Sequence, residues 1–251
     1  MQKSLSVIAL FVILLFVSSS FATISPAVQV GMNSVEPQNA QSLTFTMTVP
    51  PLPVPQVQAG FEFHAGLLSM DNSTLMKTTL SYGCQIAAHK ACFPPFLNRY
   101  IFYVTILNTV TTSRLQLPSQ GYAVTPGSLY NVTIQAVNPC VLQHSPAWSF
   151  SIKNSTTSFS TKVCSTTIDS PPLNKNFDQV VAGLLEIHNV TLCSQFPSQG
   201  SFTQNSISAL YNATRLPLNW VEYISPNPLV NCNFNDTASN GNQTVQINWT
   251  P

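Results

Sequence analysis

Apolar and polar residues alternate in short runs along most of the chain. In one run two phenylalanines alternate with Glu62 and His64, and in a later run a leucine and an isoleucine alternate with Glu186 and His188. Successive side chains of a β-strand point to opposite faces. Each of these segments therefore predicts a strand with one apolar face and one face that carries a carboxylate and an imidazole.

Ten runs are alternating or rich in β-branched and aromatic residues, and clusters of Pro, Gly and Asn separate them. No stretch keeps a helical apolar period long enough to bury one face of a helix. The pattern predicts an all-β fold in which two antiparallel sheets pack as a β-sandwich or jelly roll. The predicted strands are Leu43–Val49, Gln58–His64, Thr74–Tyr82, Tyr100–Leu107, Tyr130–Val137, Trp148–Lys153, Ser158–Val163, Ala182–Val190, Gly200–Ile207 and Thr244–Trp249.

The first residues have the features of a secretory signal peptide. Lys3 supplies a positive charge, an apolar run extends from Val7 to Val17, and small residues precede Ala22. A run of this length is too short to span a bilayer, and the small residues are typical of a cleavage site. We expect residues 1–22 to be a signal peptide and residues 23–251 to form a single domain of an extracellular protein that does not insert into a membrane.

Eight Asn-x-Ser/Thr sequons support this location, because such sites are glycosylated in secreted proteins. Glycans would also supply solubility, since charged residues make up only 7% of the chain. The nine Lys and Arg residues nearly balance the eight Asp and Glu residues, so there is no field to attract nucleic acid or an anionic membrane. The sequons begin at Asn72, Asn131, Asn154, Asn189, Asn212, Asn235, Asn242 and Asn248.

The cysteines number six, an even count that indicates disulfides in an oxidising compartment. Metal binding is the rival interpretation, but there is no Cys-x-x-Cys pair and the four histidines are scattered, so we expect neither a metal nor a cofactor. One pair would close a short loop, a second would bracket a hairpin, and the last two cysteines would remain for each other. These pairs are Cys84 with Cys92, Cys140 with Cys164, and Cys193 with Cys232.

Four segments occur in an order found in one family of secreted proteins. They are an apolar strand that ends in Gly-Leu at Phe61–Leu68, the strand Leu75–Leu80, a Pro-Gly turn at Val124–Gly127, and a strand with a glutamate at Ala182–Val190, followed by Cys193. In this order the sequence resembles the concanavalin A-like jelly rolls, in particular the eqolisins, or glutamic peptidases, and their secreted fungal and protist relatives. The resemblance covers residues 58 to 210.

What the resemblance implies about activity depends on two positions. In eqolisins a glutamate and a glutamine on the concave sheet act together in acid, the glutamate as general base on water and the glutamine in polarising the scissile carbonyl. Glu186 matches the glutamate and is the catalytic candidate if activity remains, but the glutamine position falls on Lys77. Lysine is a point charge with no amide oxygen and favours a salt-bridged Glu186. The resemblance therefore implies the fold without the activity, since function resides in the site.

A second departure concerns the ligand. Relatives often have Trp-Pro-Gly-Leu where this chain has His64-Ala65-Gly66-Leu67, so a platform for stacking a sugar ring is missing. Other aromatic side chains remain that either stack on a sugar or belong to the core or the sheet surface. They are Tyr82, Tyr100, Tyr103, Trp148 and Trp220.

Two functions stay open at this point. The first is a non-catalytic extracellular binding or structural glycoprotein whose concave sheet recognises a glycan or a peptide. The alternative is an eqolisin-type acid peptidase or another divergent hydrolase, such as a glycosidase that uses Glu62 with Glu186, whereas no Gly-x-Ser-x-Gly nucleophile elbow is present. The candidates for the binding face are Glu62, His64, Lys77, Glu186 and His188.

Overall fold

The computed structural model describes most of the chain from residue 29 onward. The expected signal peptide, Cys84 and Cys92 with their expected disulfide, and the sequons at Asn189 and Asn242 lie outside the described residues, as does the side chain of His188. The described residues are 29–35, 39–54, 60–83, 99–111, 113–140, 145–164, 173, 175–188, 190, 192–224, 232–239 and 243–250.

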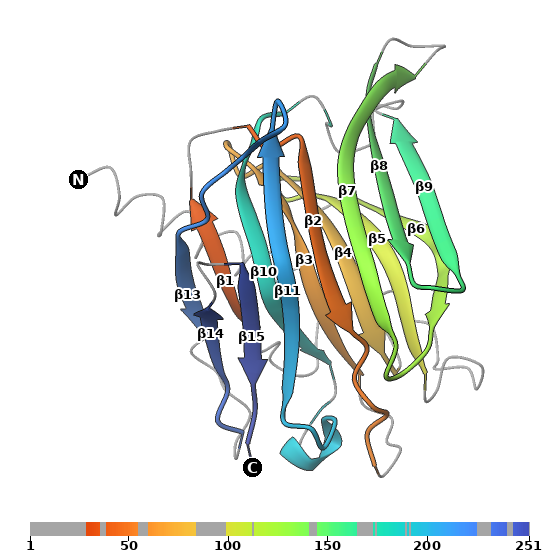
Figure 1. Ribbon diagram of the computed structural model, residues 1–251, viewed down its shortest axis with the longest axis vertical. Helices are drawn as coiled ribbons and strands as arrows, with labels where there is room; N and C mark the ends of the chain where they lie inside the picture. The colour runs from red at the N-terminus through yellow and green to blue at the C-terminus, as the bar shows by residue number, and fades with distance from the viewer. Residues whose placement is uncertain are drawn as a thin grey trace.

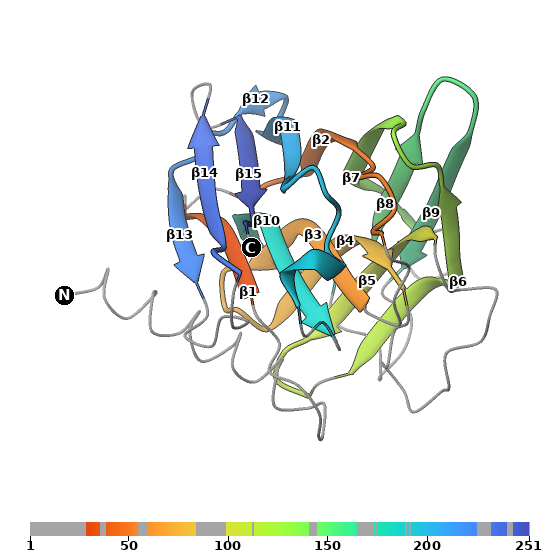
Figure 2. The same cartoon turned by 90° about the horizontal axis from the view of Figure 1, so that it is seen from below.

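Two antiparallel sheets pack face to face, as Figures 1 and 2 show from two directions, and this confirms the all-β sandwich predicted from the sequence. The seven-stranded sheet has the order β13 (Trp220–Ile224), β1 (Gln29–Val35), β10 (Phe177–His188), β3 (Gly60–Ser69), β4 (Thr74–Tyr82), β5 (Tyr100–Asn108) and β6 (Arg114–Val124). The eight-stranded sheet has the order β14 (Asn235–Ser239), β15 (Thr244–Asn248), β11 (Ser201–Tyr211), β2 (Ser42–Thr48), β7 (Leu129–Cys140), β8 (Ser145–Lys153) and β9 (Ser158–Cys164), and β12 (Thr214–Arg215) pairs with β11.

Each of the ten predicted strands coincides at least in part with an observed strand, but the number of strands was underestimated. The described residues also contain β1, β6, β12, β13 and β14, which the sequence pattern did not indicate. The longest of these is β6, whose Pro118 and Gly121 interrupt the alternation that marks a strand. The other four are short or polar, so they carry little signal.

Aromatic rings fix which face of the seven-stranded sheet points into the core. Phe63 of β3 stacks on Phe202 of β11, with 4.0 Å between ring centroids and 17° between ring planes. Phe61, on the same face of β3, stacks on Tyr82 of β4 at 5.1 Å. Pairs of this kind contribute about 0.5–1.5 kcal/mol each beyond burial. The alternate residues of β3 therefore point to the outer face, by which we mean the face of the seven-stranded sheet directed away from the other sheet.

A β-bulge changes the phase of β10 in the middle of the strand. Val181 pairs with Gly66 and Leu184 pairs with His64, so β10 advances three residues while β3 moves back two. Val180 and Leu185 both belong to the core, although an uninterrupted strand would turn them to opposite faces. The extra residue thereby turns the residue after Leu185, which is Glu186, to the outer face.

Gly183 makes this bulge possible. Its φ of +63° lies in the left-handed region, and a Cβ built on it would lie 2.4 Å from Cγ1 of Val245 in β15. Its backbone N–H donates to Oε1 of Gln204, 2.7 Å away, and Nε2 of Gln204 donates to the backbone oxygen of His64 at 3.3 Å. Gln204 is a buried residue of β11, so one amide from the opposite sheet holds the bulge against β3.

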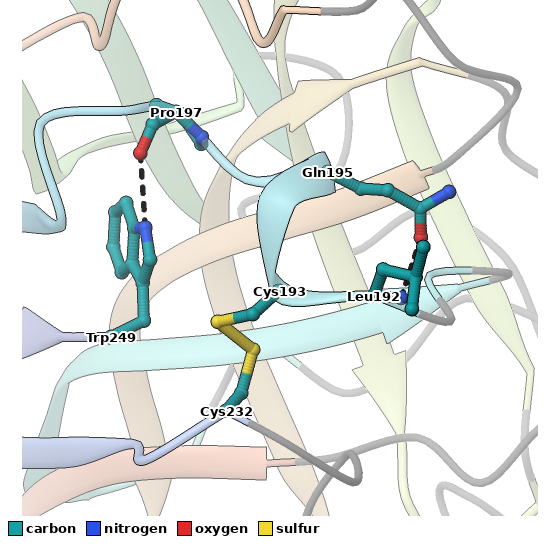
Figure 3. The surroundings of a disulfide bond; sticks show 6 residues. All are labelled: Leu192, Cys193, Gln195, Pro197, Cys232 and Trp249. Atoms are coloured by element: carbon teal, nitrogen blue, oxygen red, sulfur yellow. Dashed lines mark hydrogen bonds between the residues drawn. A yellow bond between two sulfur atoms is a disulfide. The ribbon is translucent and has the colours of Figure 1, made fainter. Parts of the chain in front are cut away.

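Two disulfides are present among the described cysteines, and they are two of the three expected pairs. Cys140 and Cys164 bracket the hairpin of β8 and β9. Cys193, in the 3-10 helix η2 (Cys193–Gln195), is joined to Cys232, and beside this bond the indole of Trp249 donates to the backbone oxygen of Pro197 (Figure 3). No helix in the described ranges is both long and apolar enough to cross a membrane.

Replacing Gly183 with alanine is expected to destabilise the fold more than the same change at Gly127. Both glycines have positive φ, +63° and +78°, and left-handed backbone costs an L-residue about 1–2 kcal/mol. Only at Gly183 does the added Cβ meet a neighbour, and overpacking costs about 1–3 kcal/mol more. Urea denaturation of both variants measures the difference.

Val245→Ala supplies the control, because it removes the methyl group that the new Cβ would meet. In that background Gly183→Ala and Gly127→Ala should lower the free energy of unfolding by similar amounts. Equal losses in the unaltered background would mean that the bulge accommodates a side chain and would contradict this account.

Candidate functional site

Four ionisable side chains from three strands converge on the outer face. Glu62 and His64 come from β3, Lys77 from β4 and Glu186 from β10, and all four are buried. They reach one place because β10, β3 and β4 are neighbours in the sheet and Glu186 pairs directly with Glu62. We call this set the polar cluster. Four of the five residues predicted for the binding face thus lie together, and the fifth, His188, has no described side chain.

One carboxylate oxygen of Glu186 receives two contacts. Nζ of Lys77 donates to Oε2 at 3.4 Å, and Nε2 of His64 lies 3.2 Å from the same atom. The proximity of Lys77 and Glu186 that the sequence led us to expect is therefore observed, while the roles of these residues stay a prediction. A buried pair of this kind has lost most of its hydration, so removing either partner leaves a buried charge uncompensated.

His64 is held by partners on both ring nitrogens. Nδ1 lies 2.9 Å from the hydroxyl of Thr79, while Nε2 lies 3.2 Å from Oε2 of Glu186 and 3.3 Å from Nζ of Lys77. The carboxylate favours a proton on Nε2, whereas the ammonium favours an Nε2 that accepts. Burial, and after it the charge of Lys77, lower the pKa of His64 from its usual 6.5, against the opposing effect of the two carboxylates. The imidazole is accordingly neutral at neutral pH.

Glu62 is anchored through Oε1, the carboxylate oxygen that does not face His64. The hydroxyl of Tyr103 donates to Oε1 at 2.6 Å, and that of Ser81 donates to the same atom at 3.5 Å. Burial and the charge of Glu62 raise the pKa of Tyr103 well above 10, so the phenol keeps its proton and remains a donor. Oε2 of Glu62 faces Nε2 of His64 at 3.5 Å. Tyr103 was considered from the sequence only as a stacking or core residue, because nothing local indicates that its hydroxyl reaches β3.

The row of paired residues that runs across the sheet through Lys77 contains a buried hydroxyl with no hydrogen-bond partner among the described residues. Gly66, Lys77, Thr105 and Gln116 lie directly opposite one another on β3, β4, β5 and β6. Oγ1 of Thr105 is buried and has no hydrogen-bond partner within the described part of the structure. Unsatisfied buried hydroxyls are uncommon in native proteins and call for an explanation. At the other end of the row, a Cβ on Gly66 would lie 2.1 Å from the backbone oxygen of Met76, so this position requires glycine.

The cluster also has the composition of a metal site. Glu62, His64 and Glu186 each offer one ligand atom, and these atoms all lie within 4.8 Å of one another. This arrangement cannot be recognised in the sequence, because the three residues lack the short spacing of cysteines or histidines that marks a metal site. His64 and Glu186 are 122 residues apart in the chain and meet only through sheet pairing.

Comparison with known proteins finds similarity in structure and none in sequence. No protein-family model matches the sequence, and no curated protein matches it. The chain is similar to SCP-B, a member of the eqolisin family of peptidases solved in complex with the tripeptide Ala-Ile-His, with a TM-score of 0.54 and 10% identity over 89% of this chain and 98% of that one. It is also similar to scytalido-glutamic peptidase, solved with a transition state analog inhibitor, with a TM-score of 0.55, 12% identity and the same two coverages.

These similarities establish the fold. Each of these two structures is matched over nearly its whole length, so the chain has the β-sandwich fold seen in the eqolisin peptidases. This confirms the resemblance drawn from the order of the sequence segments. At 10–12% identity the comparison carries no information about which residues act, and the chemistry has to be argued from the polar cluster itself.

The burial of His64 predicts that this residue contributes to a loss of folding stability in acid. Its pKa is 6.5 in the unfolded chain and lower in the folded one, so between these values the unfolded state binds more protons. The contribution of His64 to stability is present above about pH 6.5 and is lost as pH falls through the folded pKa. His64→Gln, which cannot titrate, should therefore lose less stability on acidification than the wild type.

Urea denaturation at several pH values between neutral and mildly acid, with a chelator present, measures this difference. Thr79→Val is the control, because it removes the hydrogen bond to Nδ1 but leaves the imidazole in place. That variant should keep the acid dependence of the wild type. If His64→Gln runs parallel to the wild type over this range, the imidazole is not the group responsible.

Proposed function

We propose that the protein is an extracellular, non-catalytic glycoprotein that binds peptides on the outer face of its seven-stranded sheet. The observation that carries the proposal is the double contact on Oε2 of Glu186, from Lys77 and from His64. It bears on catalysis, since it occupies the carboxylate that the family's chemistry would use. The polar groups that surround it then serve recognition.

The double contact makes Glu186 a poor general base. A base has to take a proton from water, and a positive charge at hydrogen-bond distance makes a carboxylate harder to protonate. Lys77 also lacks the amide with which the family's glutamine polarises a carbonyl, so the electrophilic half of the mechanism has no counterpart at this position. Both requirements of the peptidase reaction are therefore opposed by the same side chain.

The distribution of sequons supports the choice of face. Among the described residues, Asn131 is exposed on the outside of β7, and Asn235 and Asn248 lie opposite each other on β14 and β15, all in the eight-stranded sheet. Asn154 and Asn212 lie in turns of the same sheet, and the seven-stranded sheet has Asn72 in the turn after β3. Glycans on these asparagines would cover the eight-stranded sheet and leave the strands at the centre of the outer face without a glycan.

The class of ligand follows from the fold relatives and from the compartment. SCP-B was solved with a tripeptide, so a peptide is the ligand class for which this fold has a precedent. Two disulfides and the sequons favour an oxidising, extracellular location. A divergent acid peptidase is the second candidate, and the buried position of Glu186 on the same fold is the observation that favours it.

The glycosylated protein is expected to leave denatured casein intact from neutral to acid pH. The reason is the ion pair between Lys77 and Glu186, which persists until the carboxylate is protonated. Gel electrophoresis after prolonged incubation measures cleavage, with Glu186→Gln as the matched variant. Cleavage in acid that this substitution abolishes would overturn the non-catalytic proposal. Lys77→Gln restores an amide, and activity in that variant alone would show that the lysine removed it.

A substitution on the outer face is expected to weaken binding, whereas a substitution on the exposed face of the eight-stranded sheet is not. Gln116 lies in the row that runs across the sheet through Lys77, whereas Gln135 is exposed on the outside of β7 in the opposite sheet. With denatured casein as the probe and the protein immobilised, biolayer interferometry should show weaker binding for Gln116→Ala and unchanged binding for Gln135→Ala. Binding of a mannan probe in place of casein would point to a glycan ligand.

A further inference from the structure

We propose that Glu62, His64 and Glu186 form a binding site for one zinc ion, and that the ammonium group of Lys77 occupies the fourth position of this site when no metal is bound. The proposal concerns the polar cluster but does not depend on peptide binding. It explains why a lysine lies among these three side chains and what the unpartnered hydroxyl next to it can do.

Four of the distances among these atoms are close to those of a tetrahedral metal site. Nε2 of His64 lies 3.2 Å from Oε2 of Glu186 and 3.5 Å from Oε2 of Glu62. Nζ of Lys77 lies 3.3 Å from the same Nε2 and 3.4 Å from Oε2 of Glu186. A zinc ion held at about 2.0–2.2 Å by four tetrahedral ligands spaces those ligands about 3.3–3.6 Å apart. The structure thus already has a cation beside two of the three candidate ligand atoms, those of His64 and Glu186.

The candidate ligands are also oriented by second partners, as ligands in metal sites are. The hydroxyl of Thr79 contacts Nδ1 of His64 and can accept as well as donate, so the imidazole can move its proton to Nδ1 and present a free Nε2 without any change in the number of protons. Tyr103 fixes Oε1 of Glu62 and leaves Oε2 directed at the cluster. These contacts use atoms other than the candidate ligand atoms, so they orient the two side chains and leave the ligand atoms available.

The ligand set selects zinc over the hard cations. Calcium takes six to eight oxygen ligands, and magnesium keeps several waters in an octahedron. Three side chains that offer one nitrogen and two carboxylate oxygens in a buried site match zinc, which binds nitrogen and oxygen with four ligands. Because its ligands come from three strands, a bound metal would stabilise the folded state.

A second hydrogen-bond acceptor lies within reach of the ammonium of Lys77. Thr105 lies directly opposite Lys77 across the β4–β5 pair, and its buried Oγ1 has no partner among the described residues. Side chains at directly opposed positions of an antiparallel pair are within reach of each other. When zinc takes the cluster, the displaced ammonium can donate to this hydroxyl. The unsatisfied oxygen is then the acceptor that the metal-bound form uses.

The test is a titration of the full-length glycosylated protein with Co²⁺, followed by its visible absorption, and with Zn²⁺ in competition. We expect one site per chain that is lost in His64→Gln and in Glu62→Gln. Lys77→Met keeps the length of the side chain but removes the charge that opposes the metal, so it should bind Zn²⁺ about tenfold more tightly or better. Circular dichroism establishes that each variant is folded.

Thr105→Val separates this proposal from a merely structural role of the cluster. In the otherwise unaltered protein it should weaken Zn²⁺ binding, because the displaced ammonium loses its acceptor, whereas in the Lys77→Met background it should have no effect. The proposal is overturned if folded Lys77→Met shows no saturable binding, if it binds no more tightly than the wild type, or if binding survives in His64→Gln. Because the titration contains no peptide, its failure would leave the casein experiments unaffected.

Discussion

One amide group determines whether the polar cluster exists at all. Gln204 accepts from the N–H of Gly183 and donates to the backbone oxygen of His64, so it joins β11 to both strands that carry the acids. Without the extra residue that this amide holds, the period of two along β10 would turn Glu186 toward the core, on the face of Val180. The position of the carboxylate is therefore set by a bulge, and the bulge by a residue of the opposite sheet.

The electrostatics of the cluster follow from this position. Two carboxylates brought together out of water require a compensating cation, and their desolvation is costly unless each is also hydrogen-bonded. Lys77 supplies the charge, while Tyr103, Ser81 and the imidazole of His64 supply the hydrogen bonds. Lys77 thus stabilises the carboxylates and at the same time makes them harder to protonate. An acid-base site and a stably folded ionic cluster make opposite demands on this one position.

Local pattern predicted the parts of the site that depend on a single strand. Alternation along β3 placed Glu62 and His64 on one face, and alternation after the bulge did the same for Glu186. What the sequence could not supply was the phase change at Gly183, because one glycine among apolar residues is compatible with an unbroken strand. The contribution of Tyr103 was equally hidden, since it depends on the pairing order of β3, β4 and β5. The strand β6 escaped notice because its proline and glycine break the pattern on which detection relies.

The contact between Gly183 and Val245 has a consequence for the order in which the molecule matures during synthesis. Val245 belongs to β15, whose residues leave the ribosome after every strand that contributes to the polar cluster. Until β15 docks beside β11, the side chain that packs over the bulge is missing, while the amide of Gln204 can already bind Gly183. The three charged side chains of the cluster and the neutral imidazole therefore depend on a bulge that is fully packed only when the last strand has docked. A chain shortened before β15 would retain every residue of the cluster and yet lack the packing that keeps Glu186 in register with Glu62.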